Sequence, residues 1–297
     1  MHARKWISNS LEVLETIPEE DRAAEIDIGT GNLPTTKALG ISWQAKHDES
    51  IFKVGDEMTM PDEITKRNVL KTVCRIFDPL GFLAPYVVRG KQIMQDIWLS
   101  GVDWDENVRE AEKLNFERWF EELKHLDKIK ISRCLKNENN ETQLKSMSIH
   151  TFVDASSIAY GAVTYLRCEY ENDDVTVRFV AAKSRVAPTE STSIPRLELL
   201  AATLGLKLTS RICKTLEIEI KQVTLWSDSM NVIYWIRKNS RQFKTFVANR
   251  IAEIHRVTNL SQWRYVPTNE NPAGQCQEVY LLTVLLLRTI VGKAPAS

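Results

Sequence analysis

The spacing of apolar residues changes character about halfway along the chain. In most of the first half, apolar residues recur every three to four positions, which indicates amphipathic helices, whereas residues 37–54 alternate more like strands. The helices expected there cover 65–76, 86–99 and 108–126. The stretch 136–146 is polar and has few apolar side chains, so we expect a linker at this point.

After the linker, apolar and polar residues alternate, which indicates β-strands. The expected strands cover 148–156, 159–170, 175–186, 221–229 and 262–268. Helical spacing returns in the segments 194–216, 230–238 and 244–257. The apolar face of the first of these helices is expected to consist of Leu197, Leu200, Ala201, Leu204 and Leu208. This order of elements predicts a mixed α/β domain in the second half, whereas the first half is expected to be mostly helical.

The composition is that of a globular protein, with 43% hydrophobic and 26% charged residues. This balance excludes a collagen, a coiled coil and a chain that is disordered throughout. The 39 basic and 39 acidic residues cancel over the 297 positions. Residues 1–150 nevertheless carry 21 basic and 26 acidic groups, and residues 151–297 carry 18 and 13. Positive charge confined to the second half favours a polyanionic ligand there.

Cysteine usage and the chain ends point to an intracellular protein. The five cysteines are scattered without a C-x-x-C pair, so we expect neither a disulfide framework nor a structural zinc site. The first residues contain no apolar signal-peptide core. The apolar run 279–291 is interrupted by polar residues and is too short to span a bilayer. We therefore expect a protein of the cytoplasm or nucleus that has no contact with a membrane.

Three acidic residues lie at the ends of elements in the second half. Asp154 ends one expected strand, Asp228 ends another, and Glu198 lies in the first turn of the helix between them. Carboxylates that gather at one sheet edge repel one another unless they are protonated or bridged by cations such as Mg²⁺ or Mn²⁺. Two such ions can activate water for phosphodiester cleavage. The pattern alone favours a simpler alternative. In this alternative, Asp154 and Asp228 are ordinary polar residues at strand ends, and Glu198 is a charge at a helix N-terminus that the helix dipole favours.

Several motifs in the second half resemble the ribonuclease H domain of BEL/Pao-type retrotransposon polyproteins. In order, they are IHTFVDASSIAYGAVTYL, VAAKSR, IPRLELLAA, LWSDS, FVANRIAEI and WRYVPTNENPA. Upstream, TKRNVLKTVCRIFDPLGFLAPYVVRGKQIMQDIW and GVDWDENV are similar to the segment between the polymerase core and that domain, which is often labelled the Pao retrotransposon peptidase family. The resemblance covers nearly all of residues 4–273.

The resemblance implies a fragment of a pol polyprotein in which a connection-like helical region precedes a ribonuclease H-like domain with a mixed five-stranded sheet. The expected segments are a remnant of the polymerase end at 1–60, the helical region at 61–135, the linker at 136–146, the ribonuclease H-like domain at 147–274 and a divergent tail at 275–297. A polymerase domain would lie upstream in the parent polyprotein. No Asp-Thr-Gly or Asp-Ser-Gly triplet and no Tyr-x-Asp-Asp motif occurs in the sequence. We therefore expect neither protease nor polymerase activity.

The family's catalytic set consists of four acids, in the order Asp, Glu, Asp, Asp, that bind two divalent metal ions, Mg²⁺ or Mn²⁺. Asp154, Glu198 and Asp228 fall on the first three positions, and the resemblance therefore implies hydrolysis of the RNA strand of an RNA–DNA hybrid. The fourth acid is expected in a sequence like N-P-A-D, but this chain has Gly274 there, and the resemblance ends at that residue. We therefore expect impaired catalysis. The alternatives are a catalytically inactive nucleic-acid-binding or structural remnant, and an interaction module built on residues 60–130.

Basic residues of the second half are candidates for contacts with the phosphates of such a hybrid. The candidates are Lys183, Arg185, Arg196, Arg237, Lys238, Lys244 and Arg250, together with Ser229, whose hydroxyl could donate to a phosphate or a 2′-hydroxyl. A solvated helix–loop–helix surface explains the basic stretch 237–250 equally well. For Ser229, a role in a turn is the more common one.

Overall fold

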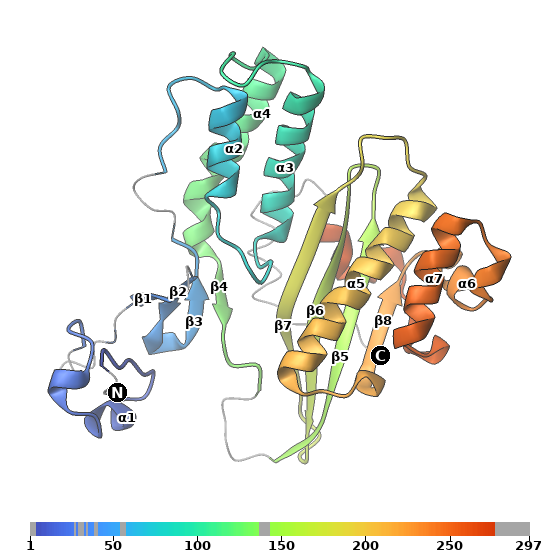
Figure 1. The fold of residues 1–297 in the computed structure, drawn as a ribbon. Coiled ribbons are helices and arrows are strands. Elements are labelled where there is room, and N and C mark those ends of the chain that lie inside the picture. The colour runs from blue at the N-terminus through green and yellow to red at the C-terminus, as the bar shows by residue number, and fades with distance from the viewer. Residues whose placement is uncertain are drawn as a thin grey trace. The chain divides into compact units, whose positions relative to one another are not determined.

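The computed structural model describes residues 4–26, 28, 33, 35–38, 41–53, 58–136 and 143–276 (Figure 1). The described chain forms two compact units. The small unit contains the described residues up to 60 together with 120–134. The large unit contains 61–119 and the described residues from 135 onwards. None of the helices in these ranges is both long and apolar enough to cross a membrane.

The small unit is built around a four-stranded antiparallel sheet. Its strands are β1 (Thr35–Ala38), β2 (Ile41–Gln44), β3 (Glu49–Ile51) and β4 (Lys130–Ser132), in the order β1-β2-β3-β4. The short helix α1 (Leu11–Glu15) precedes them, and the Ser10 side chain caps its first turn by accepting from the Val13 backbone N–H. The pairing of β3 with β4 places residues 130–132 in the same sheet as the N-terminal segment.

The helices of the first half are α2 (Lys66–Cys74), α3 (Ala84–Leu99) and α4 (Glu110–Glu121). The predicted third helix, 108–126, ends early, because a 3-10 helix takes over at Glu122–Lys128. Residues three apart in a 3-10 helix lie on the same side, which here buries both Leu123 and Leu126.

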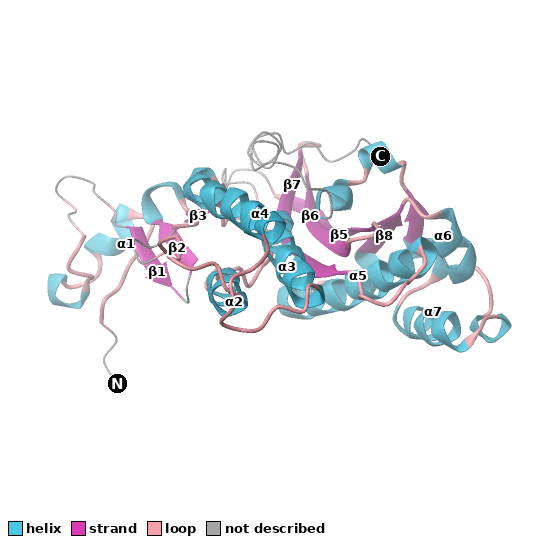
Figure 2. Ribbon diagram, turned by 90° about the horizontal axis from the view of Figure 1, so that it is seen from above, coloured by secondary structure: helices cyan, strands magenta, loops and turns pink. Residues whose placement is uncertain are grey.

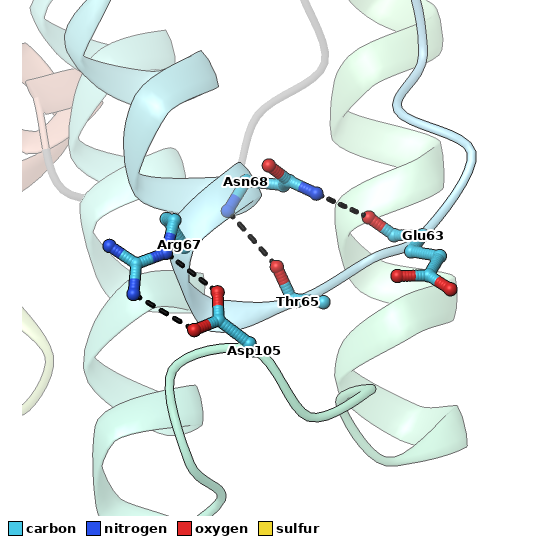
Figure 3. A network of polar contacts seen from close by, with 5 residues as sticks. All are labelled: Glu63, Thr65, Arg67, Asn68 and Asp105. Atoms are coloured by element: carbon cyan, nitrogen blue, oxygen red, sulfur yellow. Dashed lines mark hydrogen bonds and ion pairs between the residues drawn. The ribbon is translucent and has the colours of Figure 1, made fainter.

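A polar network fixes the start of α2 (Figure 3). The Thr65 hydroxyl accepts from the Asn68 backbone N–H at 3.3 Å and so caps the helix. The Asn68 side chain donates to the Glu63 carbonyl at 2.9 Å. Arg67 forms a two-pronged ion pair with Asp105, at 2.6 and 2.9 Å, which ties α2 to the loop that follows α3.

The large unit contains the mixed five-stranded sheet that the sequence predicts. Its strands are β5 (Leu144–Ala155), β6 (Ala159–Tyr170), β7 (Val175–Val186), β8 (Val223–Ser227) and β9 (Trp263–Tyr265). The order is β7-β6-β5-β8-β9. The strands β5, β6 and β7 are antiparallel neighbours, whereas β5 with β8 and β8 with β9 are parallel pairs. Of the predicted linker, residues 137–142 lie outside the described residues, and β5 begins at Leu144.

One face of this sheet is covered by α5 (Ile194–Leu216), with α6 (Met230–Ile236) and α7 (Thr245–Val257) on the same side (Figures 1 and 2). The helix α5 packs closely, because Gly205 lies where an added Cβ would come within 2.4 Å of the Val153 side chain. Leu197, Leu206 and Ile254 are fully or almost fully buried in this core. The apolar face that the sequence assigns to α5 is therefore the face that meets the sheet.

The other face of the sheet is partly covered by the segment that leads into α3. The Ala182 backbone N–H of β7 donates to the Leu80 carbonyl at 2.8 Å, and Phe82 packs against Phe179 with ring centroids 5.2 Å apart. Gly81 has φ +75°, and an added Cβ would lie 1.9 Å from the Ala182 carbonyl oxygen. Only glycine combines this backbone angle with so close an approach. These contacts make the helical segment 61–119 part of the same compact unit as the sheet.

Candidate active site

Two of the three candidate acids lie at the carboxyl ends of neighbouring parallel strands. Val153 of β5 and Ser227 of β8 are direct partners across the pair. Asp154 is the last residue but one of β5, and Asp228 directly follows β8, so both lie at the same edge of the sheet. Since paired strands lie about 4.8 Å apart, the two backbones are neighbours at this point.

Asp228 carries an oxygen that lacks the partner a buried acceptor needs. Its Oδ1 atom is buried and has no hydrogen-bond partner among the residues that the structure describes. A buried carboxylate oxygen without a hydrogen bond lowers the stability of the fold more than a buried neutral group without one. Such an atom is suited to a positively charged ligand, because a cation would supply the missing interaction.

Glu198 reaches the same region from the first turns of α5. Its Oε2 atom accepts a 2.5 Å hydrogen bond from the Ser229 hydroxyl, and Ser229 directly follows Asp228. Burial raises the pKa of the Glu198 carboxyl; the hydrogen bond from Ser229 opposes the rise, and the charge of Asp228 adds to it. The Asp228 carboxylate therefore lies close enough to Glu198 to raise its pKa.

Residue 274 lies beside Asp154 in space. The Asn271 side chain donates to the Val153 carbonyl at 3.1 Å and accepts from the Ala273 backbone N–H at 3.1 Å. These bonds hold the 3-10 helix Pro272–Cys276 against β5. A Cβ added at Gly274 would lie 3.2 Å from the Asp154 Oδ2 atom. A side chain at this position would therefore meet the Asp154 carboxylate directly.

Asp154, Glu198 and Asp228 are neighbours, but their carboxylates are not arranged around one shared metal position. Within 58–136, 143–276 and the other described segments, no group of three or more His, Cys, Asp or Glu residues is arranged to hold a metal ion. The Glu198 carboxylate is instead engaged by Ser229 at the start of α6. The donor set is nevertheless of the type that Mg²⁺ and Mn²⁺ prefer, since all three residues offer carboxylate oxygens.

Ser229 does not have the position expected for a contact with nucleic acid. The residue is only 5% exposed, and its hydroxyl oxygen accepts from the Val232 backbone N–H at 3.3 Å, which caps α6. The same hydroxyl donates to Glu198. Because both roles hold it inside the protein, the geometry favours a structural role for Ser229 over the expected phosphate contact.

Two of the predicted basic residues share one aromatic ring. The Arg250 guanidinium lies 3.6 Å from the centroid of Phe246, and the Arg196 guanidinium lies 5.3 Å from it. Arginine stacks favourably on such a ring. The arrangement joins the start of α5, two residues before Glu198, to α7.

The remaining basic candidates are on the surface. Lys183 and Arg185 are exposed on β7, while Arg237, Lys238 and Lys244 are exposed after α6 and before α7. Lys238 lies over the ring of Tyr234 at 5.5 Å. All five can reach solvent, as a phosphate contact requires, but so can the residues of an ordinary solvated surface.

Asn271 is a site residue that the sequence pattern did not single out. It is only 6% exposed, and it ties the segment containing Gly274 to the strand that carries Asp154. The Asn-Pro pair at 271–272 is a turn signal that could have drawn attention to it. Its bond to Val153, 118 positions away, has no signature in the local sequence.

The solved structures to which this chain is weakly similar include two of foamy virus protease-reverse transcriptase. The structure of the foamy viral protease-reverse transcriptase dRH in complex with double-stranded DNA is 14% identical, with a TM-score of 0.41. The match covers 79% of this chain and 38% of that one, so this chain spans well under half of its length. The native prototype foamy virus protease-reverse transcriptase is also 14% identical, with a TM-score of 0.26, covering 75% of this chain and 28% of that one.

Among curated proteins, no match is found. The model of one protein family matches residues 65–229, which is more than half of the chain and includes Asp154, Glu198 and Asp228. By this match, the chain belongs to the family of Pao retrotransposon-like RNaseH-like domains.

Proposed function

We propose that residues 147–274 of the large unit form the ribonuclease H-like domain of a BEL/Pao-type retroelement polyprotein, and that this domain hydrolyses the RNA strand of RNA–DNA hybrids. The observation that supports this most is the position of Asp154 and Asp228 at the carboxyl ends of neighbouring parallel strands, with an unsatisfied buried oxygen on Asp228. Glu198 adds a third carboxylate at the same edge. The hybrid and an upstream polymerase domain are the proposed partners.

We assign two tasks to the chain's own residues. Asp154, Glu198 and Asp228 would hold two divalent ions, Mg²⁺ or Mn²⁺, which supply an activated water and stabilise the leaving oxygen. Ser229 holds Glu198 in place until the ions bind. In the reaction, water attacks the phosphorus and the bond to the 3′ oxygen breaks, leaving a 3′-hydroxyl and a 5′-phosphate.

Gly274 weakens this machinery, because it offers no oxygen from a side chain. A Gly274→Asp change would place a fourth carboxylate against Asp154, since the Cβ position is 3.2 Å from its Oδ2 atom. Without a cation, the two like charges would repel and destabilise the fold. With a cation, the added carboxylate would supply the missing ligand.

Cleavage of a labelled RNA–DNA hybrid in Mg²⁺ tests the proposal. We expect weak cleavage by the wild-type chain, a gain of at least tenfold in Gly274→Asp, and loss of activity in Asp154→Asn. Gly274→Asn is the matched control, because it has the same shape without the charge and should give no gain.

The proposal fails if Gly274→Asp brings no gain and Asp154→Asn brings no loss. If these variants are inactive but bind the hybrid as the wild type does, the chain is the inactive nucleic-acid-binding remnant instead.

A further inference from the structure

Two tryptophans are exposed side by side where α3 ends. Trp98, in the last turn of α3, is 59% exposed, and Trp104, in the loop that follows, is 39% exposed. Their rings meet edge to face with centroids 5.8 Å apart. The next residue after Trp98, Leu99, is 63% exposed. We call these three residues the tryptophan surface. Exposed apolar side chains that lie together, unlike scattered ones, mark a site of interaction.

The backbone beneath the tryptophan surface is fixed by contacts between the start of α2 and the loop after α3. The Arg67 backbone N–H donates to the Trp104 carbonyl at 3.1 Å, and the Val108 backbone N–H donates to the Ile64 carbonyl at 2.9 Å. The ion pair of Arg67 with Asp105 adds a contact between side chains of the same two segments (Figure 3). The surface is thus preformed, which lowers the entropic cost of binding a partner.

The two tryptophans already hold cations of the chain itself. The Lys66 Nζ atom lies 5.0 Å from the ring centroid of Trp98 and 5.7 Å from that of Trp104. Lys66 is only 7% exposed, and among the described residues its ammonium group forms no ion pair. The Arg67 guanidinium lies 5.8 Å from the Trp104 ring. Rings that attract these cations offer the same attraction to a cation of a partner on the area that stays exposed.

The surroundings of the tryptophan surface are acidic. The segments 61–68 and 102–110 lie side by side and together contain six acidic and three basic residues. Asp62, Glu63 and Asp103 are exposed, and within the described part of the chain they form no ion pair. The Glu63 carboxylate makes none of the contacts drawn in Figure 3. This excess of negative charge repels the phosphates of a nucleic acid and attracts a basic partner.

We propose that the tryptophan surface binds an arginine-bearing basic segment of another protein. An arginine guanidinium is planar, so it can stack on Trp98 or Trp104 while its N–H groups reach a neighbouring carboxylate such as that of Asp103. A lysine ammonium lacks this planar group. Exposed ion pairs contribute little by themselves, so the tryptophans supply most of the affinity. Such binding is independent of the proposed function, because it uses neither the candidate active site nor a hybrid.

Titration of a fluorescent peptide of alternating arginine and glycine with the full chain, followed by anisotropy, tests this proposal. We expect Trp98→Ala to weaken binding about fivefold, the loss of one cation–π contact. Glu63→Gln combined with Asp103→Asn should weaken binding about threefold at low salt and leave it unchanged at high salt. If circular dichroism shows that Trp98→Ala is misfolded, the double variant decides, because both of its side chains are exposed. A peptide of alternating lysine and glycine should bind the wild type more weakly than the arginine peptide does.

Two single substitutions outside the surface are matched controls. Trp6 is a tryptophan of the small unit that is 48% exposed, and Asp173 has a carboxylate that is 91% exposed in the turn between β6 and β7. Trp6→Ala and Asp173→Asn should bind the arginine peptide as the wild type does. Equal weakening by Trp6→Ala and Trp98→Ala, or equal affinity for the arginine and lysine peptides, would overturn the proposal.

Two further results would assign the tryptophan surface to a different occupant and so also overturn the proposal. One is that Trp98→Ala weakens the binding of single-stranded RNA and leaves the binding of the arginine peptide unchanged, which would make the surface a nucleic-acid contact. The other is that the wild type self-associates in sedimentation velocity and Trp98→Ala does not, again with unchanged peptide binding. The surface would then be a contact between copies of this chain.

Discussion

Replacement of Ser229 by alanine is the change that most directly probes how the candidate site is held together. The hydroxyl caps α6 through Val232 and donates to Glu198, and the residue is 5% exposed. Loss of a cap costs about 1 kcal/mol, and loss of a hydrogen bond to a charged acceptor costs about 1.5–3 kcal/mol. We therefore expect Ser229→Ala to lower the free energy of unfolding by roughly 2.5–4 kcal/mol at pH 7.

Urea unfolding in EDTA measures this loss of stability. Two comparisons separate the contribution of the helix cap from that of the hydrogen bond to Glu198. Thr65→Ala removes a cap with the same 3.3 Å geometry on α2, so it should cost only about 1 kcal/mol. A double-mutant cycle with Glu198→Ala isolates the hydrogen bond, for which we expect a coupling energy of about 1.5–3 kcal/mol. A coupling near zero at pH 7 would refute the assignment of Ser229 as the residue that holds Glu198.

Two further predictions concern stability. Because the pKa of Glu198 is raised in the folded protein, its ionisation removes stability as the pH rises through that pKa. The side chain of Glu198→Gln cannot ionise. Urea unfolding in EDTA should therefore show this variant to be more stable than the wild type at pH 8 but not at pH 4. Equal stability of the two proteins at pH 8 would contradict the prediction. Gly81→Ala combines a strained φ of +75° with a clash against the Ala182 carbonyl and should cost about 2–5 kcal/mol in thermal unfolding. Gly101→Ala, with φ +77° in open space, should cost only about 1–2 kcal/mol, and equal losses would mean that the segment before α3 is not docked on β7.

Local patterns were sufficient to predict most elements of the large unit. The alternation in TFVDAS and TLWSDS predicts two strands and places Asp154 and Asp228 at their ends, where the structure has them. Apolar spacing likewise predicts α5 and the face that it buries. These signals are local, because the pleat of a strand and the turn of a helix repeat over a few residues.

Contacts between distant segments could not be predicted in this way. The parallel pairing of β5 with β8, the anchoring of residue 274 through Asn271, and the docking of Leu80 on β7 each join segments separated by 70 residues or more. The predicted boundaries at 135 and 147 stay predictions, whereas the compact units group residues 61–119 with the sheet.

The binding of Mn²⁺ by the full chain, measured from the loss of the free-ion signal in electron paramagnetic resonance, tests most directly whether these carboxylates share cations. We expect the wild type to bind Mn²⁺, and Asp154→Asn and Asp228→Asn each to weaken the binding at least tenfold. Asp173→Asn is the control, because that carboxylate is 91% exposed in a turn and should not contribute. Equal Mn²⁺ binding by the wild type and all three variants would contradict a metal site at this edge of the sheet.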